Sequence, residues 1–181
     1  MKMTNRNVIF FAVAGLIGIF LGLQYPIIGL VLLIPLLIFV VVILMRNKSG
    51  ELSSVEATAE AKLFKASGGK SRIYVMRDGF VGGQQGMNIT INRTLNSQIR
   101  SKYFLMTELE PGKHSVNAQM ASGSKSAALD YDVELAAGEC VLLDAKLNVG
   151  LLQGTPTFDE VRKDHIAVDK LAKLKMVQWK A

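Results

Sequence analysis

Few side chains in this 181-residue chain have both the type and the spacing that chemistry requires. The densest group is formed by Asp130, Asp132 and Glu134, three carboxylates at every second position. Because successive side chains of a strand point to opposite faces, this spacing predicts three carboxylates side by side on a solvated strand face. A cation site would need further oxygen ligands that converge from elsewhere. The group therefore predicts a charged surface and no metal site.

The remaining reactive residues do not assemble into a catalytic set. The sequence contains 2 histidines and 1 cysteine. His114 follows a Pro-Gly turn and shares the parity of Val116, which predicts a place at the rim of a core, and Cys140 falls in a predicted strand. No serine or cysteine stands in a nucleophile-elbow context beside a base. We predict that the chain is not an enzyme and that it needs no cofactor.

One glycine-rich segment, Gly69-Lys70-Ser71, matches the end of a phosphate-binding Walker loop. That loop also needs an earlier glycine, where this sequence has Phe64, and it needs a strand before it and a helix after it. Here the preceding residues have a helical composition and residues 71–77 have the composition of a strand. Nucleotide binding is therefore not predicted.

A second glycine-rich segment, residues 79–86, is predicted to be a flexible connection between strands. Its apolar Phe80 and Val81 are candidates for contact with a protein partner, because binding residues are often carried on loops. The turn that contains Pro111 and His114 is the second candidate partner-binding segment.

Short strands of alternating polarity are the elements that must position these residues. Alternation predicts strands over residues 87–92, 116–120, 129–135 and 141–149, and an apolar run predicts one over 71–77. Turn residues separate them, so six or seven short strands predict an all-β antiparallel sandwich over residues 71–181. Asp164 is predicted to cap a short C-terminal helix.

The N-terminal part has a different composition, since no charged residue occurs from Val8 to Met45. A bilayer core about 30 Å thick needs roughly 20 apolar helical residues, and this run is too long for one crossing. Pro26 disfavours helix at the residue before it. We therefore predict a transmembrane helical hairpin over residues 8–45, with helices over about 8–23 and 27–45.

Three small residues, Ala14, Gly18 and Gly22, recur at intervals of four on the first of these helices. They predict a face for close helix packing, either within the hairpin or against another subunit. Basic residues flank the hairpin at both ends, so residues 1–7 and everything after residue 45 are expected in the cytoplasm. The prediction is a multi-pass protein of the bacterial inner membrane. A cleaved signal peptide over about residues 1–22 and a periplasmic C-terminal domain are the alternatives.

Residues 46–70 are predicted to be a partly helical stalk. Ser53 and Glu56 have the spacing of a capping box, residues 55–65 are rich in helix formers, and Ser67-Gly68-Gly69 ends the pattern. The net charge of +6 is scattered among acidic residues, so nucleic-acid binding is not predicted. A single cysteine excludes an intrachain disulfide.

Five short motifs follow one another in order in the C-terminal part. They are Ile73-Tyr-Val-Met-Arg77, Ile89-Thr-Ile-Asn92, Tyr103-Phe104, Leu109-Glu-Pro-Gly-Lys-His-Ser-Val116 and Leu135-Ala-Ala-Gly-Glu139. Their order resembles the bacterial domain of unknown function numbered twenty-eight forty-six, over about residues 71–175. The resemblance implies a small β-sandwich of envelope proteins without an assigned activity. Arg77, Tyr103 and His114 match family positions, but the family assigns them no role. Many members are periplasmic lipoproteins, whereas this sequence has no lipobox cysteine near its start.

Together these patterns predict a membrane-anchored, non-enzymatic β-sandwich that binds the lipid bilayer and either a protein partner or further copies of itself. A periplasmic module for a small ligand or a glycan is the alternative. A hydrolase or transferase, which would have to use His114 or Asp132, is the third hypothesis.

Overall fold

The computed structural model describes residues 50–79, 83, 85–149 and 154–180, together with residues 22, 24–25, 27, 31, 33–35, 37–38, 41 and 45. The chain divides into two compact units, Met1–Met45 and Arg46–Ala181. The second unit is a β-rich domain, and every strand that the structure describes belongs to it.

The predicted transmembrane hairpin falls within the first unit. Among the described residues, no helix is long and apolar enough to cross a bilayer. This finding contradicts the hairpin over residues 8–45 and the multi-pass inner-membrane localisation derived from it. A span needs about 20 consecutive apolar helical residues, and no described helix provides such a run. Of the predicted helix-packing residues, Ala14 and Gly18 lie outside the described residues, while Gly22 is described as helical.

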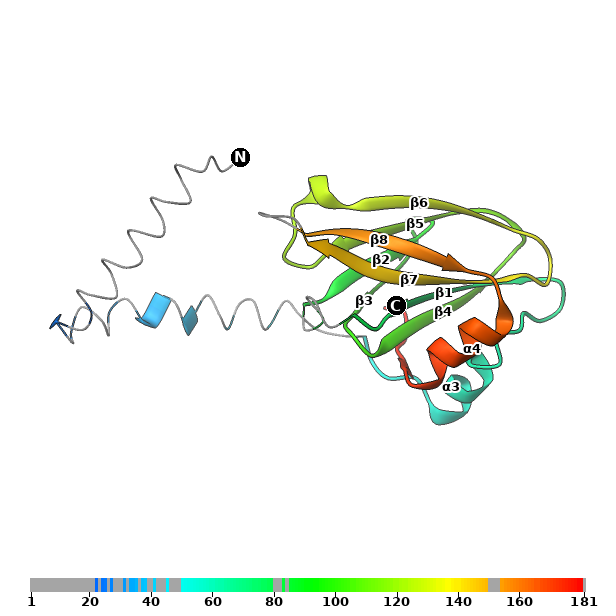
Figure 1. Cartoon of the computed structure of the whole chain (residues 1–181), viewed down its shortest axis with the longest axis horizontal. Coiled ribbons are helices and arrows are strands. Elements are labelled where there is room, and N and C mark those ends of the chain that lie inside the picture. The colour runs from blue at the N-terminus through cyan, green and yellow to red at the C-terminus, as the bar shows by residue number, and fades with distance from the viewer. Residues whose placement is uncertain are drawn as a thin grey trace. The chain divides into compact units, whose positions relative to one another are not determined.

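The domain consists of two β-sheets and a layer of short helices (Figure 1). The five-stranded sheet has the order β8-β7-β1-β4-β9, and the four-stranded sheet has the order β3-β2-β5-β6. The strands are β1 (Ser71–Arg77), β2 (Met87–Ile91), β3 (Leu95–Ile99), β4 (Tyr103–Leu109), β5 (Gly112–Met120), β6 (Leu129–Leu135), β7 (Cys140–Val149), β8 (Gly154–Val161) and β9 (Lys175–Met176). The helices are α3 (Val55–Ala61), the 3₁₀ turn η1 (Lys125–Ala127) and α4 (Asp164–Ala172).

The first hydrophobic core lies between the two sheets. In β2, Met87, Ile89 and Ile91 are fully buried, while the residues between them are only partly buried. They pack with Val75 of β1 and Leu143 of β7 in one cluster. The alternation that predicted these strands therefore selects the face that enters the core. This part of the prediction, two stacked sheets, agrees with the structure.

The second hydrophobic core lies on the other face of the five-stranded sheet, under α3 and α4 (Figure 1). Tyr74 of β1 and Phe104 of β4 pack there against Phe64, which follows α3, and against Leu171 of α4. Strand β1 is consequently buried along its whole length, on both faces. The domain thus has three layers, with the five-stranded sheet in the middle.

The predicted antiparallel arrangement is wrong for two strand pairs of the five-stranded sheet, whose other pairs, β1–β4 and β7–β8, are antiparallel. Strand β1 pairs in parallel with β7, and β4 pairs in parallel with β9. The four-stranded sheet is antiparallel throughout. Polarity alternation reports which face of a strand is buried, and it carries no information about the direction of the neighbouring strand.

The described part of the segment predicted as a stalk packs on the domain. Ser54 caps α3, because its Oγ accepts from the backbone N–H of Ala57 at 3.1 Å. The cap is thus one residue after Ser53, the serine of the predicted capping box. Phe64, which follows α3, is only 2 % exposed.

The start of α4 differs from the prediction. Its N-cap is Lys163, whose side chain makes no capping hydrogen bond, so Asp164 lies in the first turn and is not the cap.

Candidate functional site

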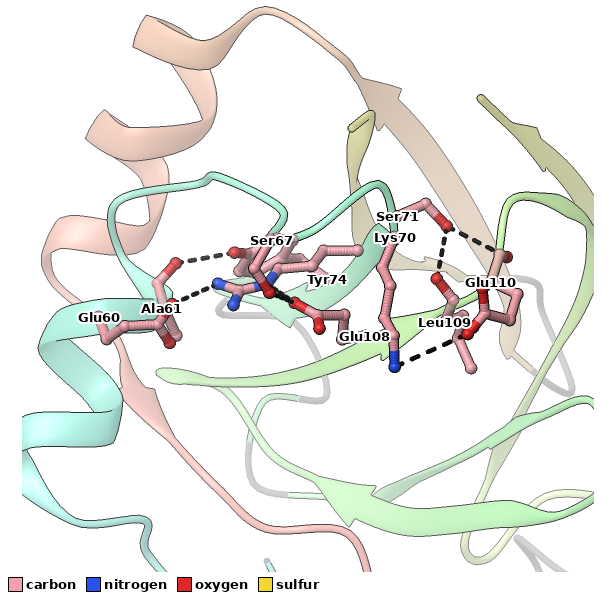
Figure 2. Close-up of polar contacts among 10 residues, drawn as sticks. Glu60, Ala61, Ser67, Lys70, Ser71, Tyr74, Glu108, Leu109 and Glu110 are labelled. Carbon is pink, nitrogen blue, oxygen red and sulfur yellow. Dashed lines mark hydrogen bonds and ion pairs between the residues drawn. The ribbon is translucent and has the colours of Figure 1, made fainter. Parts of the chain in front are cut away.

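A charged cluster around Arg72 joins α3 to the helix-covered face of the five-stranded sheet (Figure 2). The Arg72 guanidinium is almost completely buried, and its Nε donates to Oε2 of Glu108 at 2.8 Å while Nη1 donates to Oε1 of Glu60 at 2.7 Å. Ser67 Oγ donates to the same Glu108 oxygen at 2.7 Å. Burial works to lower the pKa of Arg72, but the hydrogen bonds to both glutamates outweigh it and raise the pKa. The Ser67 hydroxyl and Arg72 hold the pKa of Glu108 below its ordinary value. Because these charges satisfy one another, the cluster is structural.

Two further titratable groups lie beside Arg72 and are held in their neutral forms. Tyr74 donates its hydroxyl to the backbone oxygen of Ala61 at 2.9 Å, and burial raises the pKa of Tyr74 to about 12. Burial likewise raises the pKa of the Cys140 thiol. A thiol that is buried and protonated at neutral pH is a weak nucleophile.

The Tyr74 hydroxyl gives a prediction for stability at alkaline pH. The pKa of Tyr74 is raised from its ordinary 10.0 to about 12, so the folded state holds the proton more tightly than the unfolded chain. The stabilisation is therefore complete below pH 10 and is lost as the pH rises from 10 through 12 and above, by about 3 kcal/mol in all. Tyr74→Phe should cost about 1 kcal/mol at neutral pH, for the lost hydrogen bond.

Urea unfolding at a series of pH values between neutral and 12 measures this effect. The free energy of unfolding of Tyr74→Phe should fall less steeply with pH than that of the wild type. Tyr103→Phe, which leaves Tyr74 in place, is the matched control and should keep the wild-type slope. Parallel curves for the wild type and Tyr74→Phe would show that the buried hydroxyl does not set this dependence.

The predicted partner-binding turn contains one exposed and one buried residue. Pro111 is exposed, whereas His114 is 9 % exposed and hydrogen-bonded through both ring nitrogens. His114 Nε2 lies 2.9 Å from the backbone oxygen of Glu110, and Nδ1 lies 3.0 Å from Nδ2 of Asn92. A backbone oxygen only accepts, so Nε2 carries the hydrogen and Nδ1 accepts from the amide of Asn92. His114 thus fastens the β4–β5 turn to the β2–β3 turn.

The other predicted candidates, Phe80 and Val81, lie outside the described residues. The strand before them ends in Arg77, which is 1 % exposed and donates from Nη1 to the backbone oxygen of Gln85. Desolvation by burial lowers the pKa of Arg77. This buried cation ties the segment after β1 back to the sheet.

The outer edge of β6 carries backbone groups that no other described strand uses. Among the described residues β6 pairs only with β5, and Ser115 lies opposite Asp132. Both backbone groups of Ser115 face β2, because its N–H donates to Oδ1 of Asn92 at 3.0 Å and its oxygen accepts from the N–H of Asn92 at 2.9 Å. In an antiparallel ladder such a pair exchanges no hydrogen bond, so the N–H and C=O of Asp132 point outward. Since this direction repeats every second residue, those of Asp130 point outward too.

The side chains of β6 make this edge acidic. Asp130, Asp132 and Glu134 are exposed on the outer face of the sheet. One Asp130 oxygen accepts from the amide of Asn117 at 2.8 Å. At the far end Arg162 Nη2 donates to the backbone oxygen of Glu134 at 3.2 Å, so that outward carbonyl is already used. The free part of the edge is therefore the stretch from Leu129 to Val133.

The other three sheet edges are less open to an added strand. Strand β3 is bridged by the C-terminal segment, where the N–H of Lys180 donates to the oxygen of Asn96 at 2.9 Å. Strand β9 has two residues. Strand β8 contains Pro156, which has no N–H to donate. Within the described residues β6 is thus the regular edge best suited to pair with another chain.

Sequence reasoning identified the three carboxylates as a solvated face but missed the edge. The alternation from Asp130 to Glu134 would be the same in a central strand and in an edge strand of a sheet that has one buried face. For metals, the described residues contain no group of three or more histidine, cysteine or carboxylate side chains that could hold an ion.

Neither protein families nor curated proteins supply a relative of this chain. No protein-family model matches it, and no curated protein matches it. The resemblance to the domain numbered twenty-eight forty-six stays a prediction from its motifs.

Proposed function

We propose that this chain is a non-enzymatic β-sandwich protein that binds a protein partner by strand addition at the outer edge of β6. The partner contributes a short, extended and basic segment. The observation that supports this most directly is the outward direction of the backbone groups of Asp130 and Asp132, which follows from the hydrogen bonds of Ser115.

Backbone pairing supplies the general affinity in this binding mode. An extended peptide that lies along β6 satisfies the outward N–H and C=O groups of Asp130 and Asp132, as in other cases of strand addition. Because Arg162 already occupies the carbonyl of Glu134, the segment engages about five residues, or roughly 17 Å of chain. So short a contact suits a transient partner rather than an obligate one.

The carboxylates decide which segment binds. A residue of the added strand that lies opposite Asp130 or Asp132 points to the same outer face, where a lysine or arginine is favoured and a carboxylate is repelled. Residues between them point to the inner side, where Tyr131 packs edge-on against Phe158 with ring centroids 5.7 Å apart. The preferred segment therefore alternates basic and apolar residues.

The same charges disfavour pairing between two copies of this chain at β6. A symmetric contact would place Asp130, Asp132 and Glu134 of one copy beside those of the other, and like charges opposite each other destabilise a ladder. A partner of different sequence and opposite charge is thus favoured over self-association at this edge.

Fluorescence anisotropy of a labelled octapeptide tests the proposal on the full-length chain. A peptide that alternates lysine and valine should bind saturably, and one that alternates glutamate and valine should not. Exposed charge pairs on a sheet contribute about 0.2–1 kcal/mol each, so Asp130→Asn with Asp132→Asn should weaken binding about fivefold. Added salt should weaken wild-type binding as well.

Two further variants separate edge pairing from charge alone. Asp132→Pro removes an N–H that β5 does not use, so the fold should tolerate the proline on this edge strand. Its affinity for the peptide should fall further than that of the double asparagine variant. Glu51→Gln with Asp169→Asn removes two exposed charges elsewhere and is the matched control. Equal binding of both peptides, or full binding by Asp132→Pro, would overturn strand addition at β6.

A further inference from the structure

A cavity of about 410 Å³ lies beyond the carboxyl end of β1, between β7 and α4. Its lining includes Met76 and Arg77 of β1, Asp78 and Gly79 directly after it, Asp144 and Lys146 from β7, and Lys170 from α4. This volume is within the range of small-molecule sites. None of these residues belongs to the β6 edge.

Asp144 is the buried polar group of this cavity. It is 5 % exposed, and its Oδ2 accepts from Nζ of Lys170 at 2.8 Å. A carboxylate offers about four lone-pair sites, and within the described part of the chain the bond from Lys170 is the one hydrogen bond shown for this side chain. Among the described residues Oδ1 thus has no protein donor, and it belongs to a residue that lines the cavity.

Three ion pairs hold most of the charged groups of the lining, and Arg77, which also lines the cavity, is 1 % exposed and donates from Nη1 to the backbone oxygen of Gln85. Lys170 pairs with Asp144, Lys146 pairs with Asp159, and Asp78 pairs with Lys102. An ionic ligand would lose its hydration, and at these three pairs it would find no uncompensated charge to repay that loss. The hydrogen-bonding capacity that remains is an acceptor on Asp144 and, beside it, the further N–H donors of the Lys170 ammonium, which has three N–H groups in all.

We propose that this cavity binds a neutral polyhydroxylated small molecule. A hydroxyl donates and accepts at the same atom, so one hydroxyl can donate to Asp144 Oδ1 while a neighbouring hydroxyl accepts from Lys170. An ammonium group only donates and a carboxylate group only accepts, so neither of these groups can replace the hydroxyls at both positions. The lysine–aspartate pair stays intact when the ligand is bound.

The methyl group of Met76 reports on occupancy, because Met76 lines the cavity. The full-length chain, labelled with ¹³C at its methionine methyl groups, is titrated with glycerol, myo-inositol, glucose and mannitol, and separately with the charged relatives glucosamine and gluconate. At least one neutral polyol should shift the Met76 signal saturably and leave Met120, which packs between the sheets, unmoved. The charged relatives should bind at least tenfold more weakly.

Three variants complete the test. Asp144→Asn should weaken polyol binding at least tenfold. Gly79→Phe should also weaken polyol binding at least tenfold, because it places a ring at the rim of the cavity. An added Cβ at Gly79 meets no atom within 4 Å, so this variant can test the proposal even if Asp144→Asn does not fold. Asp130→Asn, which removes the same charge from β6, should bind like the wild type. Absence of any saturable Met76 shift, unchanged binding in Gly79→Phe, or tighter binding of a charged relative each overturns the proposal.

Discussion

Arg72→Met should lower the free energy of unfolding by about 3 kcal/mol. Removing one partner of a buried ion pair typically costs about 3–5 kcal/mol, and Arg72 serves two carboxylates at once. The expected loss lies at the lower limit because the side chains of Glu60 and Glu108 are 53 % and 26 % exposed, so water can partly solvate them once the arginine is gone. Urea unfolding at neutral pH measures the loss.

Two control variants define the origin of this effect. Arg72→Lys keeps the charge but cannot reach both carboxylates with a planar fork, so it should recover only part of the stability. Lys70→Met removes the exposed Lys70–Glu110 pair, whose atoms are 3.7 Å apart, and should cost less than about 1 kcal/mol. If Arg72→Met proved no more costly than Lys70→Met, α3 would not be held to the sheet by this cluster.

Phe104→Ala should lower the free energy of unfolding by about 3–5 kcal/mol, the usual cost of truncating a buried phenylalanine. Phe104 is fully buried in the second core, 6.4 Å from Tyr74 between ring centroids. The size of the loss tests whether the helix-covered face is a packed core of the domain or a loosely attached layer. Urea unfolding followed by far-ultraviolet circular dichroism provides the value.

Ile89→Ala is the comparison from the first core and should cost about 2–5 kcal/mol. Because the five-stranded sheet contributes to both cores, each variant should unfold in a single transition. A loss below about 1 kcal/mol for Phe104→Ala, beside a normal loss for Ile89→Ala, would mean that α3 and α4 do not share the cooperative unit.

Alternation in the sequence was sufficient to locate strands with one buried face. The clearest are β2, β5 and β6, where apolar residues such as Ile89, Val116 and Val133 enter the core at every second position. Strand β3 escaped prediction because its residues between Leu95 and Ile99 are polar, and Ser97 and Gln98 are nonetheless buried. Burial of polar residues leaves no periodic apolar signal.

Features that depend on partners distant in sequence could not be predicted. In the sequence, Arg72 and Tyr74 belong to a run that predicts a strand. Only the packing of α3 over β1 makes them members of one buried network. Similarly, the parallel pairing of Ile73 with Val141 joins segments far apart in the chain. The free edge of β6 is of the same kind, because it depends on which strand is last in the sheet.

Hydrogen exchange of the β6 amides during peptide binding tests strand addition most directly. The N–H groups of Asp130 and Asp132 face outward, whereas those of Tyr131 and Val133 face β5, as the alternation of the antiparallel ladder requires. When the full-length chain binds the lysine–valine octapeptide, exchange at Asp130 and Asp132 should slow markedly, while Tyr131 and Val133, already protected, should change little. Binding of the peptide without new protection at Asp130 and Asp132 would contradict the proposed function.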